Sequence, residues 1–183
     1  AREASILARE YLAMTYAQLG RLDEAKVQVD ALVKVFPSTS VSYYRVYYAH
    51  HKREEDRVHI LEGLRRAGVP EWPFGYEGRS EDRLDGRAIK TLSFGQTWIG
   101  NIHAGSQFIQ EIGKDGKVAY RSEQSLVTGT ASVEADMLCL KSAYFMGRKR
   151  CGYLYRNPKG TLEEKNEYIY VRPTLLMFFS PVR

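Results

Sequence analysis

The sequence has little that would name a chemistry. It contains two cysteines in 183 residues, too few for a disulfide scaffold. No apolar run approaches the roughly 20 residues of a membrane-spanning helix, and the start of the chain lacks the layout of a signal peptide. The contents of 44% hydrophobic and 27% charged residues are those of an ordinary globular chain. We therefore expect a cytoplasmic protein with one large domain or two small ones, without a membrane span.

Motifs for catalysis and for cofactor binding are missing as well. The chain has no GxSxG elbow, no P-loop, no GxGxxG and no CxxC. His50, His51 and His59 lack the HExxH spacing and have no Cys or acidic partner at the interval of a metal site. The acidic runs 54–56 and 163–167 are typical of solvated surface. We predict no catalytic residue, no metal site and no cofactor in this chain.

Charge of a single sign is not concentrated anywhere along the sequence. The net charge is +5, but the basic residues are scattered, and the only tight cluster is 148–150, in an expected hairpin loop. Nucleic-acid binding requires a basic stripe with stacking aromatics, or a recognisable module. We therefore expect a solvated loop and no nucleic-acid partner.

The two cysteines flank that loop. Counting outward from its centre near Phe145 places Cys139 and Cys151 opposite one another on paired strands. They could form a cross-strand disulfide or a redox pair, or they could be two small buried apolar groups in a reducing cytosol. We favour the second interpretation because one pair alone does not make a disulfide framework.

The first 70 residues carry helical periodicity, with apolar positions predicting helices over 4–18, 22–35, 40–51 and 54–67. Gly20, Pro37, Gly68 and Pro70 mark the ends of these helices. The first residues already show this periodicity without an initiating Met, so we expect the chain to be the C-terminal part of a longer protein.

The first helix pair resembles a tetratricopeptide repeat. Residues at the signature spacings of that repeat are Leu12, Ala13, Tyr16, Gly20, Ala25 and Pro37. The sequence departs from the pattern at Arg9, where an aromatic residue is usual, and at Leu32, which replaces a small residue. The resemblance implies a helical scaffold that binds a protein partner or associates with itself.

Four tyrosines in the third helix are the candidate protein-interaction residues: Tyr43, Tyr44, Tyr47 and Tyr48. A binding patch on the concave side of a repeat stack is the functional interpretation. Packing against a neighbouring helix or domain is the commoner role of such a stripe. Because two helix pairs are fewer than the usual three repeats, we also expect upstream repeats or a dimer to cover the open end.

The segment 41–73 is similar to the C-terminal repeat region of bacterial class III adenylate cyclases. The likeness is carried by Leu61, Gly63, Leu64, Arg65, Ala67, Gly68, Pro70 and Glu71. It implies that the parent protein makes cyclic AMP in the cytoplasm. Nothing in the chain matches the metal-binding segment of the cyclase, so the resemblance places catalysis outside it.

After a Pro- and Gly-containing linker over 71–84, the periodicity changes from helix to strand. A short helix starting at Asp85 precedes candidate strands over 97–103, 107–112, 118–122, 129–133, 137–142, 151–156, 167–172 and 175–180. Asp115-Gly116 and the run 157–160 have the composition of tight turns. Consecutive short strands without helices between them favour an antiparallel up-and-down β-barrel. The fold class is therefore α+β, with helical repeats over 1–70 and the barrel over 85–183.

The order of motifs in the strand region resembles small calycin-like (lipocalin-like) domains. The matching residues are Thr97, Gly100, Asp115, Gly116, Gly129, Leu138, Cys139 and Cys151, and the Trp usual after the position of Gly129 is missing. An eight-stranded barrel is wide enough to be filled by side chains or to hold one small ligand. The candidate ligand-binding residues are Trp98, Phe108, Tyr120, Tyr153, Tyr155 and Arg156, with Arg156 orienting an anionic group near the rim. The alternative is that these rings simply fill the interior.

The sequence thus predicts a non-catalytic regulatory and interaction region of an adenylate cyclase-like protein, with a ligand-sensing β domain. A purely structural or oligomerising module is the first alternative. An enzyme of lipocalin-like shape is the second.

Overall fold

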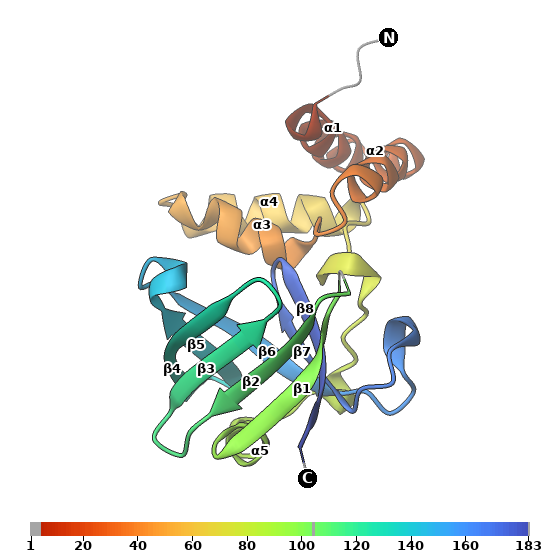
Figure 1. Cartoon of the computed structure of the whole chain (residues 1–183). Coiled ribbons are helices and arrows are strands. Elements are labelled where there is room, and N and C mark those ends of the chain that lie inside the picture. The colour runs from red at the N-terminus through yellow and green to blue at the C-terminus, as the bar shows by residue number, and fades with distance from the viewer. Residues whose placement is uncertain (1–4, 104, 183) are drawn as a thin grey trace. The chain divides into compact units, whose positions relative to one another are not determined.

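The computed structural model of the chain describes residues 5–103 and 105–182, and it divides the chain into two compact units (Figure 1). The helical unit comprises residues 1–77 and the barrel unit residues 78–183. The boundary falls inside the stretch 71–84 that the sequence marks as a linker. Each unit has its own apolar core.

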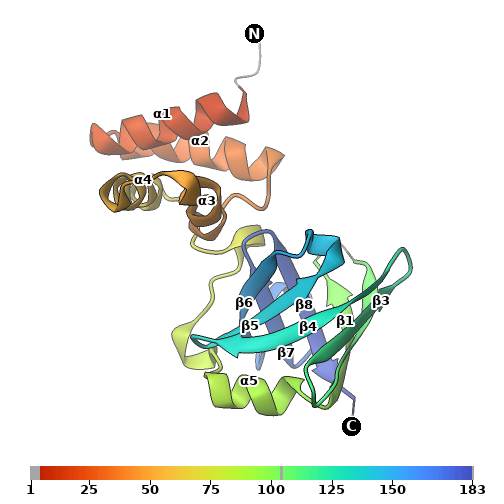
Figure 2. The same ribbon diagram turned by 90° about the vertical axis from the view of Figure 1, so that its left-hand side faces the viewer.

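The helical unit is built from two helix pairs. Its elements are α1 (Ile6–Gln18), α2 (Leu22–Val35), α3 (Val41–Tyr47), the 3-10 turn η1 (Tyr48–His50), α4 (Glu54–Arg66) and the 3-10 turn η2 (Pro73–Gly75). The hydroxyls of Ser5 and Ser40 accept the backbone N–H groups that are otherwise unpaired at the starts of α1 and α3. Fully buried Ala13 and Ala25 allow the close approach of α1 and α2, which lie side by side in Figure 2.

The barrel unit begins with the 3-10 turn η3 (Ser80–Asp82) and α5 (Gly86–Ser93). The strands are β1 (Gln96–Ile102), β2 (Gln107–Ile112), β3 (Lys117–Ser122), β4 (Leu126–Glu134), β5 (Met137–Ser142), β6 (Lys149–Arg156), β7 (Tyr168–Arg172) and β8 (Leu175–Pro181), with η4 (Ala143–Phe145) and η5 (Thr161–Glu163) in the connections. Each strand pairs antiparallel with the next, and β8 pairs with β1 to close the barrel. Closure leaves no free sheet edge.

One end of the lumen is filled and covered. The Trp98 and Phe179 rings stack with their centroids 3.9 Å apart, and Tyr168 stacks on Phe179 at 5.6 Å. Helix α5 lies across this end of the barrel in Figures 1 and 2 and buries Ile89 completely. The Trp98 indole N–H donates to the Leu92 carbonyl at 3.1 Å, so the helix is tied to the lumen by a hydrogen bond as well as by packing.

Three glycines allow the strands to approach closely enough to close the barrel. A Cβ at Gly100 would lie 1.8 Å from the Phe178 carbonyl oxygen, and one at Gly129 would lie 2.2 Å from that of Lys141. A Cβ at Gly152 would lie 2.7 Å from Cγ of Arg172. Any side chain at these positions would force the neighbouring strand away.

The α+β class and the antiparallel barrel predicted from sequence are confirmed, and the barrel is compatible with a calycin-like form. The predicted strand 129–133 is in fact longer, running over Leu126–Glu134. The predicted helix 40–51 divides into α3 and η1, with Ser40 as the cap rather than the first helical residue. The predicted helix 4–18 is observed from Ile6, and its first position lies outside the described residues.

The preferred interpretation of the cysteines as free thiols is wrong, because Cys139 and Cys151 form a disulfide. The register of β5 and β6 places them directly opposite one another, as counted from the sequence. Cβ atoms of directly opposed residues lie about 4.5–5.5 Å apart, so little rearrangement is needed to join the two sulfurs. The bond ties together the two strands that carry the η4 connection.

We expect this disulfide to stabilise the barrel unit. The cysteines are separated by 12 positions, and closing a loop of similar length in the unfolded chain is worth up to about 3 kcal/mol. Dithiothreitol should therefore lower the free energy of unfolding in urea, and the double variant Cys139→Ala, Cys151→Ala should be destabilised and insensitive to the reductant. Equal unfolding curves for the original chain with and without dithiothreitol would show that the bond does not form in solution.

Candidate functional site

The other end of the lumen contains a cavity of about 420 Å³. Its walls come from strands on both sides of the barrel, and at its mouth lie Ser106, the β3–β4 connection, η4 and the strand ends Arg172 and Leu175. The apolar part of the wall consists of Ile102, Val118, Val127, Leu140, Leu175 and Met177. Cavities of a few hundred cubic ångströms with a largely apolar wall and few polar groups are typical of small-molecule sites.

A half-buried arginine with a buried Nε is the main polar group of the cavity. Arg172 is the last residue of β7, and its guanidinium lies over the Phe145 ring of η4 at 5.2 Å and over Tyr170 at 5.8 Å. Its Nε is buried without a hydrogen-bond partner, and no carboxylate forms an ion pair with the guanidinium, among the side chains that the structure describes. Burial lowers the pKa of Arg172 because desolvation disfavours the charged form.

Two further polar groups of the wall are also unsatisfied. Gln110 is 1% exposed and its Nε2 has no hydrogen-bond partner in the described part of the chain. The buried Ser142 hydroxyl, at the end of β5, likewise has none among these residues. Each buried polar group without a partner costs about 1–3 kcal/mol in desolvation. All three groups, on Arg172, Gln110 and Ser142, can donate a hydrogen bond into the same cavity.

An aromatic and hydroxyl-rich strip runs along another side of the cavity. The Tyr120 ring stacks on Phe108 with centroids 5.6 Å apart, and burial raises the pKa of its phenol. The Ser122 and Ser125 hydroxyls lie 3.0 Å apart at the β3–β4 turn, on the rim of the cavity. These groups give the cavity a polar rim, while its deeper wall is apolar except for Gln110.

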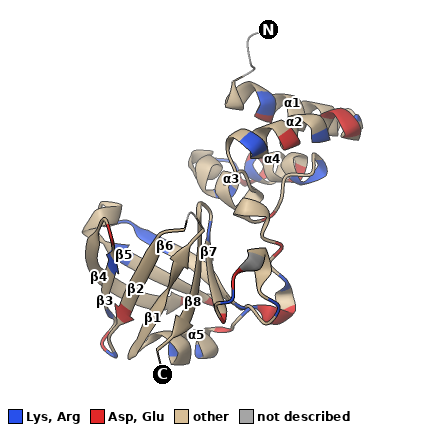
Figure 3. Ribbon diagram, turned by 45° about the vertical axis from the view of Figure 1, so that its right-hand side comes forward, with Lys and Arg blue, Asp and Glu red and all other residues tan. Residues whose placement is uncertain are grey.

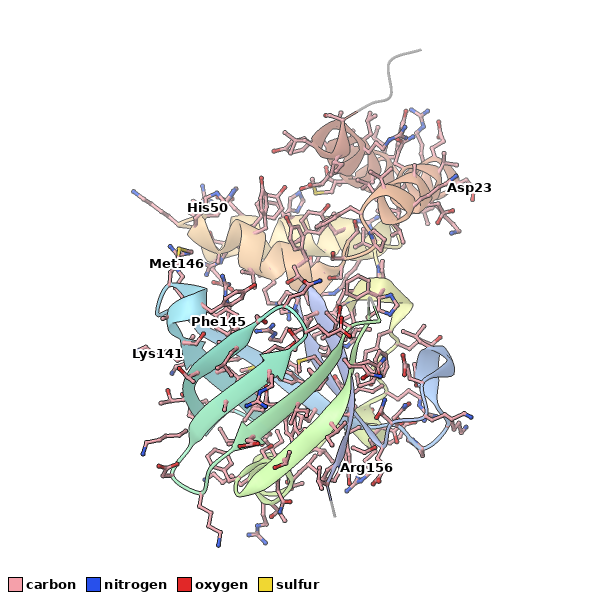
Figure 4. The ribbon with its side chains drawn as sticks, in the orientation of Figure 1. Asp23, His50, Lys141, Phe145, Met146 and Arg156 are labelled. Atoms are coloured by element: carbon pink, nitrogen blue, oxygen red, sulfur yellow. A yellow bond between two sulfur atoms is a disulfide. The ribbon has the colours of Figure 1, made fainter. Side chains whose placement is uncertain are left out.

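The charged residues at the mouth differ from Arg172 in their exposure. Lys141 and Glu123 both line the rim and are exposed to solvent, and Lys141 points away from the barrel in Figure 4. Over the rest of the barrel unit, basic and acidic residues are interspersed (Figure 3). The half-buried positive charge of Arg172 is therefore not part of a broad basic surface.

The structure distributes the predicted ligand-binding residues over four places. Tyr120 alone lines the cavity, Phe108 packs behind it, and Trp98 belongs to the filled end of the lumen. In β6 it is Leu154 that belongs to the interior cluster, so Tyr153 and Tyr155, of opposite parity, lie on the outer face. There the backbone of Arg83 forms an isolated antiparallel β-bridge with that of Tyr155, and the Arg83 guanidinium lies 4.3 Å from the centre of the Tyr153 ring.

Arg156 is not at the cavity either. It is exposed and lines an open groove beside α5, at the end of the barrel opposite Phe145 and η4 (Figure 4). The arginine that faces the cavity is Arg172, which the sequence analysis did not select. The available signal was its parity, because it is two residues beyond Tyr170 and hence on the same inward face.

The four tyrosines of the helical unit divide into packing and surface residues. Tyr44 and Tyr48 are buried, Tyr43 is half-buried against Phe36, and Tyr47 is 46% exposed. The Tyr48 hydroxyl donates to the carboxylate of buried Glu10 on α1, which also accepts from Tyr44. Of the set, Tyr47 therefore offers the largest surface to a partner, and Tyr44 and Tyr48 join α3 and η1 to α1.

Comparisons with protein-family models, with curated proteins and with solved structures gave no match for this chain. The fold and the cavity define it in structural terms, as a closed eight-stranded antiparallel barrel with a polar lumen cavity, preceded by a helical unit. Among the described residues, no His, Cys, Asp and Glu side chains gather in a group that could hold a metal ion. None of the helices described combines the length and the apolarity needed to cross a bilayer.

Glu10 gives the helical unit a predictable pH dependence. Burial raises the pKa of its carboxyl, and the hydrogen bonds from Tyr48 and Tyr44 offset this in part. A carboxyl with a raised pKa in the folded state binds its proton more tightly there, so stability falls as the pH rises from the ordinary glutamate value, about 4.3, through the folded value. Glu10→Gln keeps an acceptor for Tyr48 and should abolish this fall, which urea unfolding from about pH 4 to about pH 8 would measure.

The matched control is Glu24→Gln in α2. Glu24 is exposed and its pKa is lowered by a hydrogen bond from Arg21, so this variant should retain the fall in stability. If Glu10→Gln and the original chain showed the same fall, burial of the Glu10 carboxyl would not be its cause.

Proposed function

We propose that the barrel unit binds one small molecule in its lumen, and that the chain is a non-catalytic regulatory region of a signalling protein. The observation that carries this proposal is the cavity itself, with the buried polar groups of Arg172, Gln110 and Ser142 lacking partners among the described residues. Polar groups are normally satisfied when buried, and a cluster of unsatisfied donors in one cavity is what a ligand with acceptor groups would complete.

The resemblance to the repeat region of class III adenylate cyclases supplies the signalling context. In this proposal the helical unit is a tetratricopeptide-like scaffold, which binds a protein partner or a second copy of the chain in the cytoplasm. Its helix pairs, the small residues between α1 and α2, and the exposed ring of Tyr47 support that role. The ligand would regulate a cyclase only by binding two arrangements of it with different affinities.

A structural module without a ligand is the second candidate. It is favoured by the filled end of the lumen, where Trp98, Phe179 and Tyr168 occupy the space that a ligand would need. The two candidates differ over the cavity of about 420 Å³ at the other end of the lumen, which has no function in a purely structural module.

A pair of adjacent substitutions distinguishes the two candidates. Val127 lines the cavity and Leu126, its neighbour on β4, is 67% exposed on the outer face. Val127→Trp should fill part of the cavity, whereas Leu126→Trp adds the same ring type to the outside. Thermal unfolding of the full chain with a library of small fragments should reveal stabilising compounds for the original chain and for Leu126→Trp. A ligand at a hundred times its dissociation constant adds about 2.7 kcal/mol.

These stabilising compounds should have no effect on Val127→Trp, whose fold is checked by circular dichroism. If no compound stabilised the original chain, the structural module would be the better account. Compounds that stabilised all three proteins equally would bind outside the lumen, which would also contradict the proposal.

A further inference from the structure

One positive charge of the cavity wall, that of Arg172, is half-buried. The charged residues lining it are Arg172, Lys141 and Glu123, of which Lys141 and Glu123 are of opposite sign and exposed at the rim. Water screens exposed charges strongly and buried charges weakly. The guanidinium of Arg172 is thus the charge that a ligand inside the cavity would experience most strongly.

The guanidinium is also held in place before any ligand binds. Gly152 on β6 leaves room for the Arg172 side chain, since a Cβ there would lie 2.7 Å from Cγ of Arg172. The rings of Phe145 and Tyr170 lie against the guanidinium, and the Tyr170 hydroxyl is fixed by donating to the Leu138 carbonyl at 3.0 Å. A planar donor group held in this way matches the two oxygens of a carboxylate.

The donors stand at two levels of the lumen. Arg172 and Ser142 are the last residues of β7 and β5 and lie next to the connections that form the mouth. Gln110 lies in the middle of β2, paired with Tyr120 on one side and with Trp98 of the filled end on the other. Between these levels the wall is apolar, with Val118, Leu140 and Met177.

Building on the function proposed above, we infer that the ligand is a small monocarboxylate with an apolar body and a hydrogen-bond acceptor at its inner end. Its carboxylate pairs with Arg172 and accepts from Ser142, its body lies against Val118, Leu140 and Met177, and its inner acceptor meets the Gln110 amide. A single negative charge balances the positive charge of Arg172. A phosphate monoester, with a charge of about −1.5 to −2 at neutral pH, would leave an excess negative charge in the lumen.

Arg172 should then be required for ligand binding and should lower the stability of the protein when no ligand is bound. A buried donor without a partner, such as the Arg172 Nε, is unfavourable, and its replacement by an apolar side chain of similar length relieves that cost. Arg172→Met should therefore unfold at a higher temperature than the original chain when no ligand is present. A residue with a purely structural role would show the opposite effect.

The test uses the full chain and a set of aryl and alkyl carboxylates, each paired with its primary amide and its phosphate analogue. Half of the carboxylates carry a ketone at the end away from the carboxylate. Isothermal titration should give carboxylates an advantage of at least about tenfold over their amides, as expected for a hydrogen-bonded charge pair. Arg172→Met should weaken carboxylates about a hundredfold and leave amides nearly unchanged. Gln110→Leu should weaken only the ketone-bearing carboxylates, by about tenfold.

Arg121→Met is the matched control for the lost charge, because Arg121 is exposed on β3 and is not part of the cavity wall. It should change neither the affinity for carboxylates nor the preference over amides. Arg172→Lys keeps the charge but not the planar donor group, and it should restore part of the affinity lost in Arg172→Met.

The outcomes separate this inference from the function on which it rests. Amides or phosphates that bound as well as the carboxylates would overturn the assignment of ligand class while leaving a lumen ligand in place. The same holds if no carboxylate bound although neutral fragments stabilised the chain through the lumen. If neither the paired compounds nor the fragment library bound, both proposals would fall together.

Discussion

The account of this protein depends on a half-buried guanidinium group whose Nε is kept from water and has no hydrogen-bond partner in the described part of the chain. Proteins normally satisfy a buried polar atom, because a buried donor without a partner costs about 1–3 kcal/mol. Here Gly152 makes space for the Arg172 side chain and two rings pack against it, so its position is built into the barrel. A group that lowers the stability of the fold and is nevertheless held in place by its surroundings is characteristic of functional sites.

The two ends of the barrel lumen are packed differently, and this difference makes the arrangement possible. At the α5 end, stacked rings and a hydrogen bond from Trp98 to the helix give a packed core of ordinary kind. That core can carry the stability of the fold, and the disulfide secures the strands that lead into η4. The opposite end is thereby free to hold a cavity with unsatisfied donors, which a uniformly filled lumen of this size could not accommodate.

Much of the fold follows from the sequence, because each element is specified locally. The change from helical to alternating periodicity near residue 97, the turn at Asp115-Gly116 and the serine and aspartate caps all act within a few residues. The register of β5 on β6 could also be counted, since one hairpin connection separates them. Whether Cys139 and Cys151 are joined depends on more than that register, and the number of cysteines proved a poor guide.

The site could be predicted much less well, and the reason is physical. Alternation assigns the residues of a strand to two faces but does not say which face is inside. The aromatic face of β6, with Tyr153 and Tyr155, turned out to be the outer one, while Leu154 points inward. A buried donor without a partner is likewise a property of the assembled barrel, so the sequence did not show that Arg172, rather than Arg156, carries one.

The central claim is that Arg172 awaits an anionic partner in the lumen. Nitrogen-15 NMR of the Arg172 Nε–H group in the full chain tests it most directly, with the resonance assigned by its loss in Arg172→Lys. On addition of a carboxylate that stabilises the chain, the account predicts a large change in this resonance and slower exchange of its proton with water, as expected when a hydrogen bond forms. An Arg172 Nε–H resonance that did not change while the chain was stabilised would contradict it.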